Sequence, residues 1–166
     1  MTRENYRKMT EGLRLRPRLL KILNIANKVF TYLIFALYPF ILFYLYFNER
    51  GKLFRAVYVP AVSFVFLSVF RRIANFPRPY EVYGLPSAIV KKTKGKSFPS
   101  RHVFSAAVIG MTALYVFNTP LIGGAVLAIA LAMAVFRVVS GMHFPHDVVA
   151  GFLYALISGI IGFFIF

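Results

Sequence analysis

Residues 136–147 read FRVVSGMHFPHD and contain four side chains that can carry chemistry: Arg137, His143, His146 and Asp147. From residue 103 to the C-terminus there is no other charged side chain or histidine, and apolar segments of helix length flank the cluster. A charged group in or beside a membrane span is costly unless it is paired or hydrated, and such groups are usually functional. We therefore expect the functional site of this protein at residues 136–147.

The composition indicates a membrane protein of one domain. Hydrophobic residues make up 59% of the 166-residue chain and the mean hydropathy is +0.69, above the roughly 45–50% apolar share of soluble domains. The net charge of +15 falls mainly in two blocks before or between apolar segments. We therefore expect anionic lipid and a phosphate-bearing substrate as partners, and no nucleic acid. The absence of cysteine excludes disulfides and thiolate catalysis.

The apolar segments predict an all-α fold, a multi-pass membrane helical bundle with about five transmembrane helices. The expected spans are residues 29–47, 53–70, 102–117, 121–139 and 146–166. The first is free of charge and can cross a hydrocarbon core of ~30 Å at about 1.5 Å per residue. Residues 1–28 interleave basic residues with leucines and are too charged for a signal peptide. They predict a basic amphipathic N-terminal segment at the bilayer surface, and residues 29–166 the transmembrane domain.

The number of crossings predicts where the polar residues meet. Residues 71–101 form a long loop rich in lysine, arginine and proline, and two spans separate it from residues 137–147. Two crossings return the chain to the same side of the membrane. Basic side chains, all three histidines and the chain's one aspartate are therefore expected to converge at one end of the bundle.

The residue types in these two blocks point to phosphate chemistry. Forked guanidinium groups suit phosphate oxygens, and Ser100 precedes an apolar helix whose free amides would attract an anion. His102 falls in the first turn of that helix. His143 and Asp147 are four residues apart, so the carboxylate can hold one imidazole nitrogen and leave the other as a nucleophile. Together they favour phosphoryl transfer through a phosphohistidine. The arginines in question are Arg71, Arg78, Arg101 and Arg137.

Three motifs carry a family resemblance. Arg71 precedes Arg78-Pro79 by the spacing of K-x6-RP, residues 99–102 read PSRH, and Arg137, His143 and Asp147 match R-x5-H-x3-D. In this order and spacing they resemble the signature of the type 2 phosphatidic acid phosphatase superfamily, over about residues 53–166. That resemblance implies a multi-pass, metal-independent lipid phosphatase or diphosphatase that needs no cofactor.

The resemblance also implies a role for each matching residue. His143 would attack phosphorus and Asp147 would orient it. His102 would protonate the leaving lipid oxygen and then activate water. The equatorial oxygens of the phosphate would be bound by Arg71, Arg78, Arg137, Ser100 and the amides that follow Ser100.

Three positions depart from the usual motifs: Arg71 stands for a lysine, Arg101 for the glycine of PSGH, and Phe136 for the serine before the arginine. None removes the nucleophile or the acid, so the departures bear on substrate choice more than on catalysis. Arg101 could contact a second phosphate. No motif position includes His146, for which we expect a supporting or surface role.

The leading hypothesis is thus a phosphatase acting on a lipid phosphate or diphosphate: phosphatidylglycerophosphate, phosphatidate, undecaprenyl diphosphate or a lipid A phosphate. One alternative is a phosphotransferase that passes the phosphoryl group to an alcohol or lipid; another is a basic membrane scaffold or anion transporter. The expected location is the plasma membrane. The basic N-terminus favours a cytoplasmic active site, whereas similar bacterial enzymes mostly act at the outer face. The sequence does not indicate an oligomeric state.

Overall fold

The computed structural model describes residues 1–89, 93–117 and 119–165, and every regular element in this part of the chain is a helix. The all-α prediction is confirmed. The helices are α1 (Arg3–Arg14), α2 (Pro17–Asn48), α3 (Arg50–Ala74), α4 (Pro79–Tyr83), α5 (Arg101–Phe117), α6 (Pro120–Val139), α7 (Pro145–Gly159) and the π-helix η1 (Ile160–Ile165).

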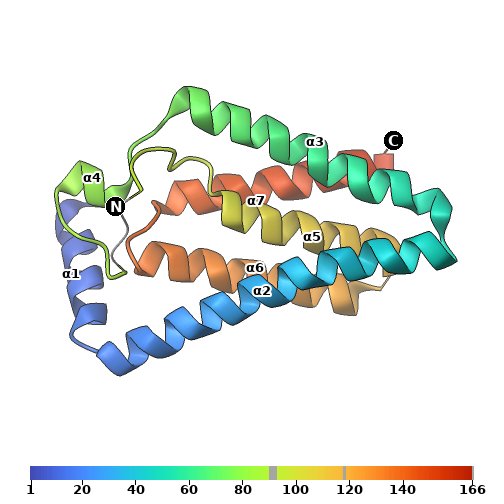
Figure 1. The fold of residues 1–166 in the computed structure, drawn as a ribbon. Helices are drawn as coiled ribbons and strands as arrows, with labels where there is room; N and C mark the ends of the chain where they lie inside the picture. Colours follow the sequence, from blue (N-terminus) through green and yellow to red (C-terminus); the bar gives the residue numbers. More distant parts are fainter. Residues whose placement is uncertain (90–92, 118, 166) are drawn as a thin grey trace.

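Among the described residues, four helical segments are long and apolar enough to cross a membrane: Pro17–Asn48, Arg50–Tyr83, Pro120–Val139 and Pro145–Ile165. The shorter apolar helix α5 lies in the centre of the bundle, against α2, α3, α6 and α7 (Figure 1). It can pack closely because a Cβ at Gly110 would lie only 3.0 Å from the Leu127 side chain of α6. Such small residues bring membrane helices together. The predicted multi-pass bundle of about five helices is confirmed.

Prolines and one left-handed residue set several helix ends. Pro17, Pro120 and Pro145 each open a helix, where the missing N–H of proline costs no intrahelical bond. Helix α3 ends at Asn75, whose φ of 43° stops the helix. Helix α2 runs without a break through residue 28, so no helix end marks the expected division between residues 1–28 and 29–166. That division stays a prediction.

The N-terminal helix α1 is packed against the loops at the end of the bundle. Tyr6 is fully buried and its hydroxyl donates to the carbonyl of Gly141 at 3.3 Å. Arg14 donates to the carbonyl of Ser87 at 2.9 Å. Gly141 has a φ of 74°, and a Cβ there would lie 2.7 Å from the Thr10 methyl carbon and 2.8 Å from the Tyr6 hydroxyl. Glycine at this position therefore permits both the turn after α6 and the docking of α1.

The loops expected to carry the site gather at one end of the molecule. Figure 1 shows α1, α4, the chain between α3 and α5, and the α6–α7 connection at this end, with the α2–α3 connection and the C-terminus at the other. This arrangement places residues 75–89 and 93–100 beside residues 140–144. It is the convergence that the number of crossings predicted.

Candidate active site

His143 and Asp147 form a buried pair where α7 begins. The His143 Nδ1 lies 3.2 Å from the Asp147 Oδ2, and the side chains are 2% and 1% exposed. Pro145 starts the helix between them, so His143 lies just before α7 and Asp147 in its first turn. An imidazole that donates from Nδ1 to the carboxylate keeps a lone pair on Nε2. The geometry thus orients the imidazole and leaves its Nε2 as an acceptor.

Two further donors hold the same carboxylate oxygen. The Ser97 hydroxyl donates to Asp147 Oδ2 at 2.5 Å and lies 3.4 Å from His143 Nδ1. The Phe144 amide donates to Oδ2 at 3.0 Å. Asp147 Oδ1 lies 3.2 Å from Nε2 of His146, whose exposed ring stacks on Phe144. The carboxylate is therefore fixed from the loop before α5 as well as from α7.

The surroundings keep His143 uncharged. Burial lowers the pKa of His143 from 6.5 to about 4, against the hydrogen bond to Asp147, which raises it. The nearby Arg78 and Arg137 guanidiniums also lower this pKa, because a positive neighbour disfavours a second positive charge. At neutral pH the imidazole is therefore in its basic form.

Ser100 connects the start of α5 to α7. Its amide donates to the carbonyl of Asp147 at 2.8 Å, and a Cβ on Gly151 would lie 2.6 Å from the Ser100 carbonyl oxygen. Gly151 therefore allows α7 to approach α5. Ser100 precedes α5 as predicted, but its buried hydroxyl has no hydrogen-bond partner in the described part of the chain. The amide of Ser100 is already engaged, whereas its hydroxyl can donate to a ligand.

Two of the predicted arginines donate hydrogen bonds to the loop that carries Ser97. The Arg71 Nη1 donates to the Ser97 carbonyl at 3.0 Å, and its Nη2 donates to the carbonyl of Lys96. The Arg78 Nε donates to the Gly95 carbonyl at 3.1 Å. These bonds tie the α3 end and the α4 start to one loop beside His143. Both guanidiniums therefore position the site as well as adding positive charge to it.

Arg137 has the most freedom to bind a ligand. It is 5% exposed, and in the described part of the chain its Nε has no hydrogen-bond partner. Its carbonyl accepts from the amide of His143 at 3.2 Å, and its guanidinium is near enough to lower the pKa of the His143 ring. Arg137 and His102 line one cavity of about 260 Å³ at this end of the bundle. The structure thus brings together residues from all three motifs.

Arg101 is directed elsewhere. Its side chain is exposed and its guanidinium lies 5.8 Å from the ring centroid of Phe64 on α3. A cation over an aromatic face is a favourable contact at a membrane interface. Its predicted contact with a phosphate stays a prediction.

The sequence reasoning missed Ser97 and Glu81. Ser97 is fully buried and donates to Asp147, yet a serine in a polar loop has no distinguishing pattern. Glu81 Oε2 accepts from the amides of Arg78 at 2.8 Å and Gly95 at 2.9 Å. Its position three residues after Arg78 has the spacing of a helix-capping glutamate, the one signal that could have identified it.

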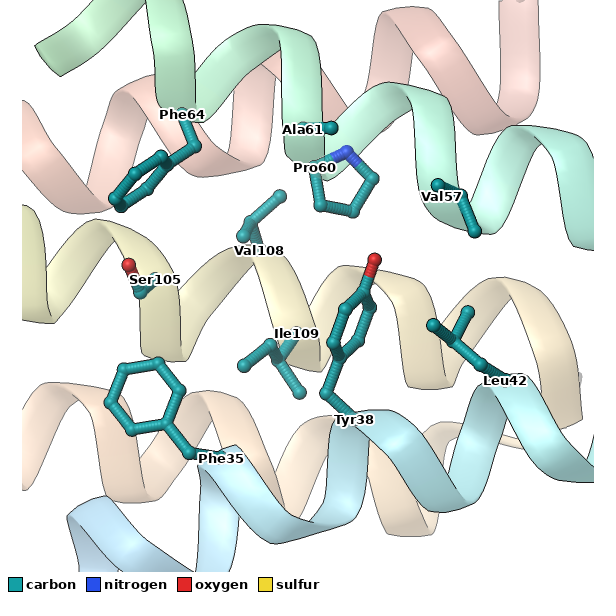
Figure 2. A pocket seen from close by; sticks show the side chains of 10 residues that line it. All are labelled: Phe35, Tyr38, Leu42, Val57, Pro60, Ala61, Phe64, Ser105, Val108 and Ile109. Carbon is teal, nitrogen blue, oxygen red and sulfur yellow. The ribbon is translucent and has the colours of Figure 1, made fainter.

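A second, apolar pocket of about 400 Å³ lies between α2, α3 and α5. Figure 2 shows side chains from all three helices pointing into it, with Phe64 and Ser105 at one end and Val57 and Leu42 at the other. Ser105 is one helical turn after His102, so this first end is the one nearer the polar cluster. The Tyr38 hydroxyl donates to the Ala56 carbonyl at 3.0 Å and links α2 to α3.

Comparisons with known proteins agree with this geometry. The crystal structure of Aquifex aeolicus LpxE is similar with a TM-score of 0.69 and 25% identity, covering 85% of this chain and 85% of that one. The first transmembrane PAP2-type phosphatidylglycerolphosphate phosphatase from Bacillus subtilis has a TM-score of 0.68 and 17% identity, covering 95% and 82%. The second likeness shows the fold alone. A search of curated proteins found no match. The family model of the PAP2 superfamily matches residues 52–166, and the chain belongs to that superfamily.

Proposed function

We propose that this membrane protein hydrolyses the phosphate or diphosphate headgroup of a lipid through a phosphohistidine on His143. The observation that carries the proposal is the buried pair of His143 and Asp147, with an Arg137 guanidinium beside it. A neutral imidazole oriented by a carboxylate is an activated nucleophile. Membership of the PAP2 superfamily and the likeness to LpxE support a lipid phosphatase.

In the first step the His143 Nε2 attacks phosphorus. The N–P bond forms, the bond from phosphorus to the lipid oxygen breaks, and protonated His102 gives its proton to the leaving oxygen. Asp147 stabilises the positive charge that the ring acquires. The phosphoryl oxygens are stabilised by the positive charges of Arg71, Arg78 and Arg137, by the Ser100 hydroxyl and by the amides that follow Ser100. Catalysis of phosphoryl transfer is chiefly electrostatic.

In the second step His102, now neutral, takes a proton from water. The water oxygen attacks phosphorus, the N–P bond breaks, and inorganic phosphate leaves. His102 is then protonated and His143 neutral, as at the start. No metal or cofactor takes part in this scheme.

The apolar pocket supports a lipid as the substrate rather than a soluble phosphate ester. It lies at bilayer depth among apolar and aromatic side chains, with its nearer end one turn of α5 from His102. A hydrocarbon tail placed there would leave its phosphate at the polar end of the bundle. We assign this pocket to the first part of the tail.

The experiment is phosphate release by detergent-purified protein in the presence of EDTA, from phosphatidylglycerophosphate, phosphatidate and undecaprenyl diphosphate. Release should survive EDTA and fall by about 10³-fold or more in His143→Ala, the usual scale for loss of a nucleophile. Full release by His143→Ala would refute the proposal. A phosphorylated alcohol in place of free phosphate would identify a phosphotransferase.

We also propose that the site faces the cytoplasm at the plasma membrane. Basic residues of α1 lie at the same end of the bundle as the basic loop before α5, and such charges favour the inner side. Because the chain has no cysteine, single cysteines at two exposed positions can test this: Thr93 at the active end and Asn48 at the other. An impermeant thiol reagent on intact cells should label Asn48→Cys and leave Thr93→Cys unlabelled; the reverse pattern would place the site outside.

A further inference from the structure

Helix α2 carries a short polar stripe between its basic first turns and its long apolar remainder. Asn24, Asn27, Lys28 and Thr31 follow the spacing i, i+3, i+4, i+7, which places them on one face of the helix. The next buried residues along α2 are Ile34, Ile41 and Leu45. The stripe is thus confined to the end of α2 nearest the catalytic loops, and it lies in the part of the chain that precedes the family-matched residues 52–166.

The stripe faces the site. Asn24, Asn27, Lys28 and Thr31 line the same cavity of about 260 Å³ as His102 and Arg137, with Tyr32, Ile89 and Met142 completing the lining. Any molecule whose phosphate reaches Arg137 from this cavity therefore lies against α2. The α2 side chains are placed to contact the part of the substrate next to the scissile phosphate.

Two polar atoms in this region are buried without a hydrogen-bond partner in the described part of the chain: the Asn27 Oδ1 and the Arg137 Nε. Buried polar atoms are normally paired, with protein, water or ligand. The Arg137 Nε is a donor and suits a phosphate oxygen. As the structure assigns the Asn27 side chain, the buried atom without a partner is the acceptor oxygen, and that acceptor needs a donor.

The need of the Asn27 oxygen for a hydrogen-bond donor decides the chemical class of the ligand. A phosphate or phosphodiester offers oxygens that accept hydrogen bonds, so it cannot satisfy the Asn27 oxygen. A hydroxyl group both donates and accepts, and it matches the amides of Asn24 and Asn27. The Thr31 hydroxyl donates to the Asn27 carbonyl at 2.7 Å and can still accept from a ligand. The one cation of the stripe, Lys28, can pair with a further anionic group on the same molecule.

We propose that the α2 stripe is a specificity subsite for a hydroxyl-bearing alcohol that carries the scissile phosphate, such as a glycerol or sugar headgroup. The inference rests on the proposed phosphatase function and names its substrate class. Phosphatidylglycerophosphate and a lipid-linked sugar phosphate have such hydroxyls next to the phosphate. Phosphatidate, whose glycerol is fully esterified, and undecaprenyl diphosphate do not.

The test compares kcat/KM for these four lipids in the native protein and in Asn27→Leu and Asn24→Leu. Asn48→Leu is the matched control, since Asn48 is an exposed asparagine at the opposite end of the same helix. Native protein should prefer the hydroxylated substrates. Loss of one or two hydrogen bonds to the headgroup should lower the ratio of kcat/KM, hydroxylated substrate over phosphatidate, by about tenfold. Because the ratio is taken within one preparation, partial misfolding cancels. Asn48→Leu should leave the ratio at its native value.

Whichever hydroxylated lipid shows the larger loss, glycerol or sugar, identifies the carrier. An unchanged ratio in both α2 variants, with release still abolished by His143→Ala, would overturn the subsite and leave the phosphatase intact; the stripe would then be a hydrated surface only. A native preference for undecaprenyl diphosphate that Asn27→Leu reduces would also overturn it, in favour of a second phosphate. Full release by His143→Ala would instead overturn the phosphatase function on which the subsite rests.

Discussion

Replacing Ser97 by alanine tests the hydrogen bond that fixes the Asp147 carboxylate. The Ser97 hydroxyl donates to the Asp147 Oδ2 at 2.5 Å in a fully buried position. A hydrogen bond to a charged group contributes about 1.5–3 kcal/mol. If Asp147 holds the ring of His143 while the ring becomes positive, Ser97→Ala loses most of this stabilisation in the transition state. At about 1.4 kcal/mol per factor of ten, kcat should fall roughly 10- to 150-fold.

The assay is steady-state phosphate release from one lipid, with kcat and KM separated. KM should change little, because Ser97 contacts the carboxylate and not the phosphate. The matched control is Ser63→Ala, which removes a buried hydroxyl whose bond, to the Val59 carbonyl at 2.5 Å, stays within its own helix. A change in kcat of less than twofold in folded Ser97→Ala would refute the reasoning, as would an equal loss in Ser63→Ala.

Three further predictions concern charge, the apolar pocket and the docking of α1. Since burial lowers the pKa of His143 to about 4, its ring should stay neutral as pH falls through 6.5 and gain a proton only near pH 4. NMR titration of histidine-labelled protein measures this. Three histidines titrating near 6.5 would contradict the prediction. Val57→Phe should shorten the apolar pocket and lower kcat/KM for substrates with long tails more than for substrates with short tails. Val135→Phe, on the exposed surface of α6, should affect the two kinds of substrate equally. Equal effects of Val57→Phe on long and short tails would argue against tail binding in this pocket. Gly141→Ala should lower the free energy of unfolding by about 1–3 kcal/mol more than Gly84→Ala, through overpacking. Both glycines have a positive φ, but only Gly141 lies against α1. Thermal unfolding in detergent measures the difference, and equal losses would contradict the docking of α1.

Much of the fold follows from the sequence because lipid imposes a simple constraint. Each apolar segment must satisfy its own backbone hydrogen bonds, so it forms a helix, and counting crossings places the polar loops. That reasoning placed His102 and Arg137 at one end of the bundle, where they line one cavity. It did not predict that α2 begins at Pro17. Lys21 and Lys28 interrupt the apolar segment but do not end the helix, because lysine favours a helix whether or not it is exposed.

The rest depended on contacts between residues distant in sequence. Ser97 meets Asp147 only because Gly151 lets α7 approach the start of α5. The docking of Tyr6 on Gly141 joins residues far apart in the chain, and hydropathy indicated only that α1 is amphipathic. The polar stripe of α2 was hidden by the basic residues around it. Its relation to Arg137 became visible once the cavity that they share was known.

The central claim is that His143 carries the phosphoryl group, and trapping that intermediate tests it most directly. Native protein, supplied with a lipid whose terminal phosphate is radiolabelled, would be quenched in alkali within one turnover and mapped by mass spectrometry. The mechanism predicts label on His143 as an N–P bond, lost on acid treatment. It predicts accumulation in His102→Ala for a labelled substrate whose leaving group needs no protonation, because only the water step then needs His102. No label at His143 in either protein, or label at another residue, would contradict the account.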